Sequence, residues 1–106
     1  MASFDKSVLN MCKAAVKMVA PDADIILFGS RARGDAQEYS DYDILILVDE
    51  KSDLKLNERI LDQIYPIELE TEAMISFVVQ NRGVWNSPLS QAMPFHKNID
   101  REGIAV

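Results

Sequence analysis

The chain has 106 residues, of which 48% are hydrophobic and 26% are charged, and its formal net charge is −6. This length suits one globular domain over residues 1–106, and the ordinary composition excludes disordered and repeat-array proteins. The longest apolar runs have four and five residues, whereas a membrane-spanning helix needs about 20. The acidic balance also excludes a broad nucleic-acid-binding surface, which requires clustered lysine and arginine.

Two further features bear on location and charge. The sequence from Met1 lacks the basic start and apolar stretch of a secretion signal, and the single cysteine, Cys12, has no partner for an internal disulfide. We therefore expect a cytoplasmic protein. Of the 17 acidic residues, 14 lie between Asp22 and Glu72, and this segment would attract a divalent cation, although acidic stretches are more often only solvated surface.

The first half of the chain predicts helix, strand, helix and strand. Apolar residues three and four apart indicate a helix from Phe4 to Val19, which Pro21 ends. The short β-branched run Asp24–Phe28 indicates a buried strand. Polar residues 31–40 predict a short helix and a loop, and Asp41–Val48 indicates a second strand.

The second half continues this alternation. Ser52 or Asp53 can cap a helix that we expect to run to Tyr65, where Pro66 interrupts it. Residues 67–73 alternate as a strand would, but their glutamates favour another helical turn. Residues 74–79 indicate a third strand, and a last helix begins at Pro94. The sequence thus predicts an α/β (α+β) fold, with a small mixed sheet and helices packed on it.

The only histidine, His96, falls in this last helix beside Phe95. We expect it to be partly exposed, without a catalytic role.

The residues that indicate chemistry lie around the first two strands. Gly29 allows the backbone to approach a ligand closely, and Ser30 adds a hydroxyl at the start of a helix, whose free N–H groups favour phosphate. Asp41 and Asp43 are two residues apart, so on a strand they share one face and can bind one hard divalent ion or a close pair of ions. If the two strands pair antiparallel, the predicted phosphate and metal positions meet.

This pattern, Gly29-Ser30, ten residues, then Asp41-Tyr42-Asp43, resembles that of the minimal nucleotidyltransferases, the smallest members of the DNA polymerase β-like nucleotidyltransferase superfamily. The segment Arg31–Ala36 and Ser40 are similar to the family as well, and residues 94–104 resemble the ends of its small single-domain members. The resemblance implies a short mixed sheet backed by helices.

The resemblance also implies roles for particular residues. Gly29 and Ser30 would hold the β and γ phosphates of a nucleoside triphosphate, and Asp41 and Asp43 would bind Mg²⁺. Arg31 or Arg33 would contact phosphate, with Arg33 preferred, and the alternative is that both are only exposed charges on the helix. An acceptor hydroxyl then attacks the α-phosphorus and pyrophosphate leaves.

The chain departs from the family pattern at the third carboxylate, which a third core strand normally supplies. If residues 74–79 form that strand, Ser76 stands roughly where the acid is expected. Glu68 or Glu70 could serve only if residues 67–70 are the strand instead. The two-ion Mg²⁺ site is therefore expected to be incomplete.

The sequence thus predicts a Mg²⁺-dependent nucleotidyltransferase that moves a nucleoside monophosphate, from ATP in the first instance, to a hydroxyl. The chain is too short for a second domain that would hold the acceptor, so the acceptor is expected on a protein, which by resemblance is a small helical toxin-like partner. The alternative is a catalytically weak nucleotide-binding or partner-binding module. A phosphatase with a nucleophilic aspartate is disfavoured because Asp41 and Asp43 precede their strand rather than follow it.

Overall fold

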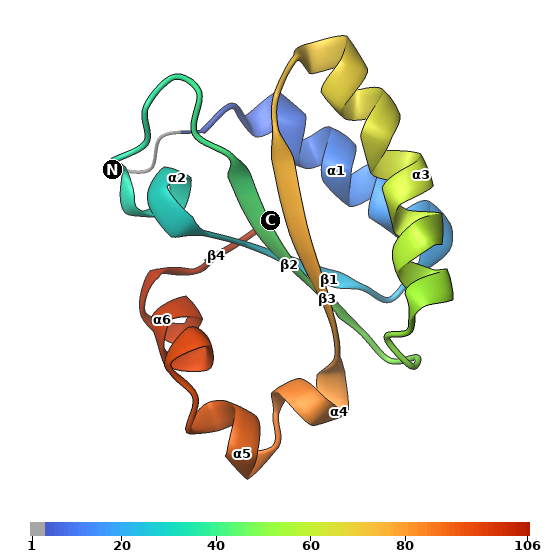
Figure 1. Ribbon diagram of the computed structural model, residues 1–106, viewed down its shortest axis with the longest axis vertical. Helices are drawn as coiled ribbons and strands as arrows, with labels where there is room; N and C mark the ends of the chain where they lie inside the picture. The colour runs from blue at the N-terminus through green and yellow to red at the C-terminus, as the bar shows by residue number, and fades with distance from the viewer. Residues whose placement is uncertain (1–3) are drawn as a thin grey trace.

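The computed structural model describes residues 4–106, so the part of the secretion-signal argument that rests on residues 1–3 lies outside it. Its centre is a mixed sheet with the strand order β3-β2-β1-β4 (Figure 1). The strands comprise Asp24–Phe28 (β1), Tyr42–Val48 (β2), Ile75–Asn81 (β3) and Ile104–Ala105 (β4). β1 pairs antiparallel with both β2 and β4, whereas β2 and β3 are parallel. The predicted mixed sheet is confirmed.

Two long helices, α1 (Lys6–Val19) and α3 (Leu54–Thr71), cover one face of this sheet (Figure 1). Asp5 begins α1 by accepting a hydrogen bond from the Ser7 amide, and Asp53 begins α3 by accepting one from the Leu56 amide. The apolar stripes of both helices meet the alternate residues of β1 and β2 in the main core, whose most buried members are Cys12, Val16, Leu27, Ile44, Ile46, Ile60 and Ile64.

The other face of the sheet is covered by an arc of short helices, in which α4 (Arg82–Trp85), α5 (Pro88–Gln91) and α6 (Pro94–Glu102) follow one another from β3 to β4 (Figure 1). A second core lies beneath this arc and joins Leu45, Leu47, Trp85 and Ile99. Both faces of β2 are therefore buried, which explains why Ile44–Val48 is apolar without alternation.

Helix α3 shows where the sequence prediction was wrong. It does not stop at Tyr65 but continues through Pro66 to Thr71. The prediction that the residues after Pro66 are helical is confirmed, and the prediction that Pro66 interrupts the helix is wrong. Proline cannot donate the helical hydrogen bond to the carbonyl four residues earlier. That carbonyl belongs to Asp62, an exposed residue, so water can take the place of the missing donor. The two-residue strand β4 was not predicted.

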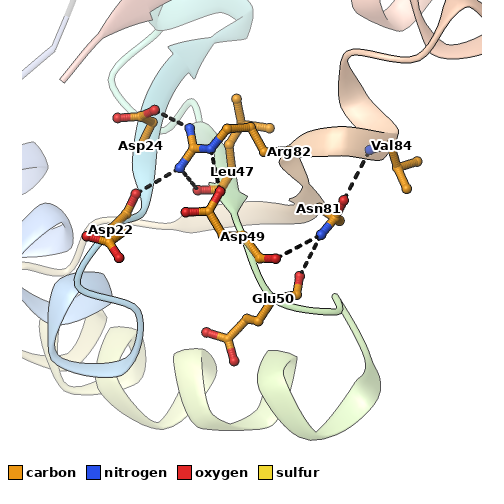
Figure 2. Close-up of polar contacts among 8 residues, drawn as sticks. All are labelled: Asp22, Asp24, Leu47, Asp49, Glu50, Asn81, Arg82 and Val84. Carbon is orange, nitrogen blue, oxygen red and sulfur yellow. Dashed lines mark hydrogen bonds and ion pairs between the residues drawn. The ribbon is translucent and has the colours of Figure 1, made fainter.

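One arginine ties the ends of three strands together at the edge where α4 begins (Figure 2). Arg82 donates through Nε to the carboxylate of Asp49 at 2.9 Å, pairs with Asp24 through Nη1, and donates through Nη2 to the Asp22 carbonyl at 2.8 Å. The neighbouring Asn81 side chain donates to the carbonyls of Asp49 and Glu50 and caps α4. These contacts fix the start of the helical arc on the sheet.

Across residues 4–106, the structure contains no helix with the length and hydropathy required to cross a membrane.

Candidate active site

The predicted phosphate-binding turn lies where β1 runs directly into the five-residue helix α2 (Gly29–Arg33). Gly29 has φ +76°, and a Cβ at this position would collide with the carboxylate of Asp43. Only glycine meets both conditions without strain. Phe28 pairs directly with Asp43 in the antiparallel register of β1 and β2, so the expected proximity of the turn to Asp43 is confirmed.

The two aspartates lie at the start of β2. Asp41 immediately precedes the strand and Asp43 is its second residue. Ser76, which pairs with Asp43 across the parallel β2–β3 register, donates a hydrogen bond from its hydroxyl to Asp41 Oδ2 at 2.9 Å. Asp41, Asp43 and Ser76 therefore converge on one face of the sheet, beside Gly29.

Charge around Asp43 is unbalanced. Partial burial raises the pKa of the Asp43 carboxyl, and the neighbouring negative charge of Asp41 raises it further, followed by that of Glu102; Arg33 opposes the shift with its positive charge. Because like charges and partial burial disfavour the ionised form of this carboxylate, a bound cation would stabilise that form.

The third acidic side chain near the turn, Glu102, comes from the end of α6. Its Oε2 pairs with Arg33 Nη1 at 3.1 Å, and its Oε1 accepts a hydrogen bond from the Gly29 amide at 3.4 Å. Its side chain is 13% exposed. The sequence analysis gave Glu102 no role, because a residue about 70 positions away from both partners leaves no local pattern.

The two arginines of α2, Arg31 and Arg33, contact different groups. Arg33 faces Glu102 and also pairs with Asp35 at 3.4 Å. Arg31 donates to the carbonyl of Ser40 at 2.9 Å and lies over the ring of Tyr42 at 4.2 Å. Arg31 thus holds the loop that leads into Asp41, whereas Arg33 is the one whose guanidinium lies beside the carboxylates.

The question of the third carboxylate has a clear structural answer. Glu68 and Glu70 belong to the helix α3 rather than to a strand, and Glu68 accepts a hydrogen bond from the Ile75 amide at 3.0 Å. The third core strand is β3, and its residue beside Asp43 is Ser76. Within the described residues, no cluster of three or more acidic, histidine or cysteine side chains could hold a metal.

Two carboxylates nevertheless suit one ion. Mg²⁺ is usually held by one or two carboxylates together with substrate phosphates and water, rather than by a cage of protein ligands. Asp41 and Asp43 provide the carboxylates of that donor set, and the Gly29 turn lies directly beside them. The residues therefore fit a single Mg²⁺ that arrives with a polyphosphate.

His96 is not at this site, and the expectation that it is partly exposed was wrong. It is 5% exposed and stacks on the indole of Trp85 with ring centres 4.0 Å apart. Its Nδ1 lies 3.1 Å from the Ser90 hydroxyl. The helical arc of α4–α6 buries this ring, and the local sequence gave no sign of that packing.

Comparison with known proteins bears on the family of the chain. A family model described as a nucleotidyltransferase domain matches residues 8–99. Two proteins of Methanocaldococcus jannaschii that are named as predicted protein adenylyltransferases, MJ0141 and MJ0604, are 40% identical over 63 residues and 37% identical over 79 residues. The matched parts are 59% and 74% of this chain and 64% and 72% of those relatives.

A solved structure shares the fold. The crystal structure described as a toxin-antitoxin with AMP-PNP superposes with a TM-score of 0.62 over 91% of this chain and 69% of that chain, at 16% identity. At this identity the likeness concerns the fold alone. Since the family model spans nearly all of the chain, including Gly29-Ser30 and both aspartates, the chain belongs to the nucleotidyltransferase domain family.

Proposed function

We propose that this protein transfers a nucleoside monophosphate from a nucleoside triphosphate, ATP in the first instance, to a hydroxyl group on a protein acceptor. The observation that carries the proposal is the convergence of Gly29, Asp41 and Asp43 at one end of the sheet. A phosphate-binding turn without carboxylates would bind an anion, and carboxylates without the turn would bind a cation. A metal-bound polyphosphate needs both.

Each residue has a defined part in this proposal. The backbone at Gly29 and the hydroxyl of Ser30 bind the β and γ phosphates, and because α2 has only five residues, these individual donors matter more than the helix dipole. Asp41 and Asp43 hold Mg²⁺, which when bound neutralises charge on the phosphates and on the departing pyrophosphate. Arg33 adds positive charge beside the phosphates, and Ser76 orients Asp41.

The acceptor is proposed from the relatives. Their names describe protein adenylyltransferases, and the structural neighbour is described as a toxin-antitoxin with AMP-PNP. We propose that the acceptor hydroxyl belongs to a partner protein, a small helical toxin-like one, and that transfer takes place in the cytoplasm. The acidic charge of the chain suits a partner with a basic surface.

A second candidate function follows from Ser76. A hydroxyl in register with Asp43 cannot bind a second ion as a carboxylate does. The chain would then bind nucleotide and partner and catalyse transfer slowly or not at all.

An assay for transfer of labelled nucleotide distinguishes the nucleotidyltransferase from the binding module. The purified chain is incubated with ATP labelled at the α-phosphate, Mg²⁺ and a cell extract, beside the variants Asp41→Asn and Asp43→Asn. The matched control is Asp62→Asn, which removes an exposed acid on α3. Label on a protein that requires Asp41 and Asp43 but not Asp62 supports transfer. Folded protein that binds ATP and gives no label supports the binding module instead.

A further inference from the structure

A pocket of about 210 Å³ lies beneath the helical arc and is lined by Gln80, Val84, Trp85 and Phe95 among others. It opens on the same face of the sheet as the carboxylates. In the parallel register Ser76 pairs with Asp43, Val78 with Leu45 and Gln80 with Leu47, so alternate residues of β3 lead from the candidate site to the pocket. Val78, between the two, is 37% exposed and provides an apolar floor.

Aromatic rings connect the pocket to the aspartates. Phe28, the direct partner of Asp43, meets Phe95 edge-on with ring centres 5.4 Å apart. Phe95 in turn meets Trp85 at 5.8 Å, and Trp85 stacks on His96. Phe95, which lines the pocket, therefore contacts Phe28, the residue paired with Asp43.

This wall is already built in the free protein. His96 is held behind Trp85 by the Ser90 hydroxyl at 3.1 Å and by Asp100 at 3.4 Å. Fixed aromatic surfaces lose little side-chain freedom when a flat ligand binds to them, which favours a planar ring as the occupant.

Gln80 is a polar residue of the pocket lining that can form hydrogen bonds with such a ring. The side-chain amide of Gln80 lines the pocket and makes no hydrogen bond to any other group in residues 4–106. A glutamine amide offers a donor and an acceptor side by side, and this pair matches the N6 and N7 atoms of adenine.

The volume of the pocket and its position relative to the phosphate site indicate which part of a nucleotide it can hold. Pockets that enclose a whole drug-sized ligand span about 300–1,000 Å³, so about 210 Å³ suits one ring system rather than a complete nucleotide. The turn at Gly29 follows β1, Asp43 is on β2 and Ser76 is on β3. A triphosphate with its β and γ phosphates at Gly29 and its α-phosphate at Asp43 therefore directs its nucleoside across the sheet to Ser76 on β3, from which Val78 and Gln80 lead along the strand to the pocket.

We infer that this pocket binds the base of the nucleotide and that Gln80 makes it selective for adenine. The inference rests on the proposed function, since it places the far end of the same ligand. It assigns the phosphates to one end of the sheet face and the base to the other, with Val78 beneath the sugar.

The test uses Trp85, which is the sole tryptophan of the chain and lines the pocket. Its fluorescence is followed during titration, in Mg²⁺, with an ATP analogue that cannot be cleaved between the α and β phosphates. Inorganic tripolyphosphate is titrated in parallel, and its binding is measured by calorimetry. The expected result is that the analogue changes the emission of Trp85, whereas tripolyphosphate binds without changing it.

Variants at position 80 complete the test. Gln80→Leu is expected to weaken binding of the ATP analogue about tenfold while leaving tripolyphosphate binding unchanged, and Gln63→Leu, an exposed glutamine on α3, should leave both unchanged. If both ligands bind but neither affects Trp85 and Gln80→Leu binds normally, the base lies elsewhere and the inference is overturned while the proposed function stands. Failure of both ligands to bind overturns the two together.

Discussion

Replacing Ser76 by aspartate tests whether β3 has been correctly identified as the strand that lacks its acid. The substitution removes the hydroxyl that donates to Asp41 and puts a carboxylate in register with Asp43. We expect Ser76→Asp to create a stronger metal site that is costly to fold when the metal is absent.

The loss of stability caused by Ser76→Asp can be worked out from the contacts at position 76. A hydrogen bond to a charged group contributes about 1.5–3 kcal/mol, and the low end applies here because Ser76 is exposed. Like charges about one strand spacing apart, roughly 5 Å, repel by about 1 kcal/mol in water and about 3 kcal/mol at a dielectric constant near 20. With the values for exposed groups in water, Ser76→Asp should lower the free energy of unfolding by about 2.5 kcal/mol, which lowers Tm by about 10–20 °C.

Magnesium should reverse this loss. An ion present at about 100 times its Kd stabilises the folded state by about 2.7 kcal/mol, so the metal and the substitution nearly cancel. Thermal melts in EDTA and in Mg²⁺ at equal ionic strength measure the difference, with Ser76→Asn as the neutral control. Transfer of labelled nucleotide should also rise in Ser76→Asp. If Mg²⁺ stabilises Ser76→Asp no more than it stabilises the unsubstituted protein, the side chain at position 76 does not face the aspartates and the reasoning fails.

Three further predictions concern other parts of the molecule. Gly34 also has a left-handed backbone, with φ +88°, so Gly34→Ala should lower the free energy of unfolding by about 1–2 kcal/mol. Gly29→Ala should lower it further and should alone abolish tripolyphosphate binding in calorimetry, because only its Cβ meets Asp43. Arg82→Met should lower stability to urea by about 1–2 kcal/mol through loss of the arginine's contacts with Asp24 and Asp49 (Figure 2). Arg59→Met, on the exposed side of α3, should change it by less than about 0.5 kcal/mol. Cys12, whose thiol pKa burial raises to about 11, should react with iodoacetamide at pH 8 only after unfolding; rapid alkylation of the native protein would contradict its placement in the core.

The parts of the fold that the sequence predicted are those encoded by local pattern. The apolar stripe of α1 repeats at fixed spacing, β1 and β2 contain short unbroken apolar runs, and the cap at Asp53 lies next to the helix that it begins. The failures are of another kind. Pro66 deprives the carbonyl of Asp62 of its helical donor, and Asp62 is an exposed residue, a fact about tertiary position that no window of sequence contains.

The candidate site divides in the same way. Gly29 and Asp43 could be paired from sequence because a turn and the start of an antiparallel neighbour must lie together. Glu102 could not, since it reaches the turn only after the arc α4–α6 has returned the chain to β1 as β4.

Glu102 also changes how the site should be understood. Its carboxylate occupies the Gly29 amide and the Arg33 guanidinium, two groups that a triphosphate would use. Bound phosphate must share or displace these contacts, and the displaced carboxylate would add to the negative charge around Asp43. A cation held by Asp41 and Asp43 would therefore also offset negative charge, because without it three carboxylates and a triphosphate would meet around one arginine. On this reasoning, tripolyphosphate should bind measurably with Mg²⁺ and far more weakly in EDTA, and equal affinity in both would show that the aspartates take no part in holding the phosphates.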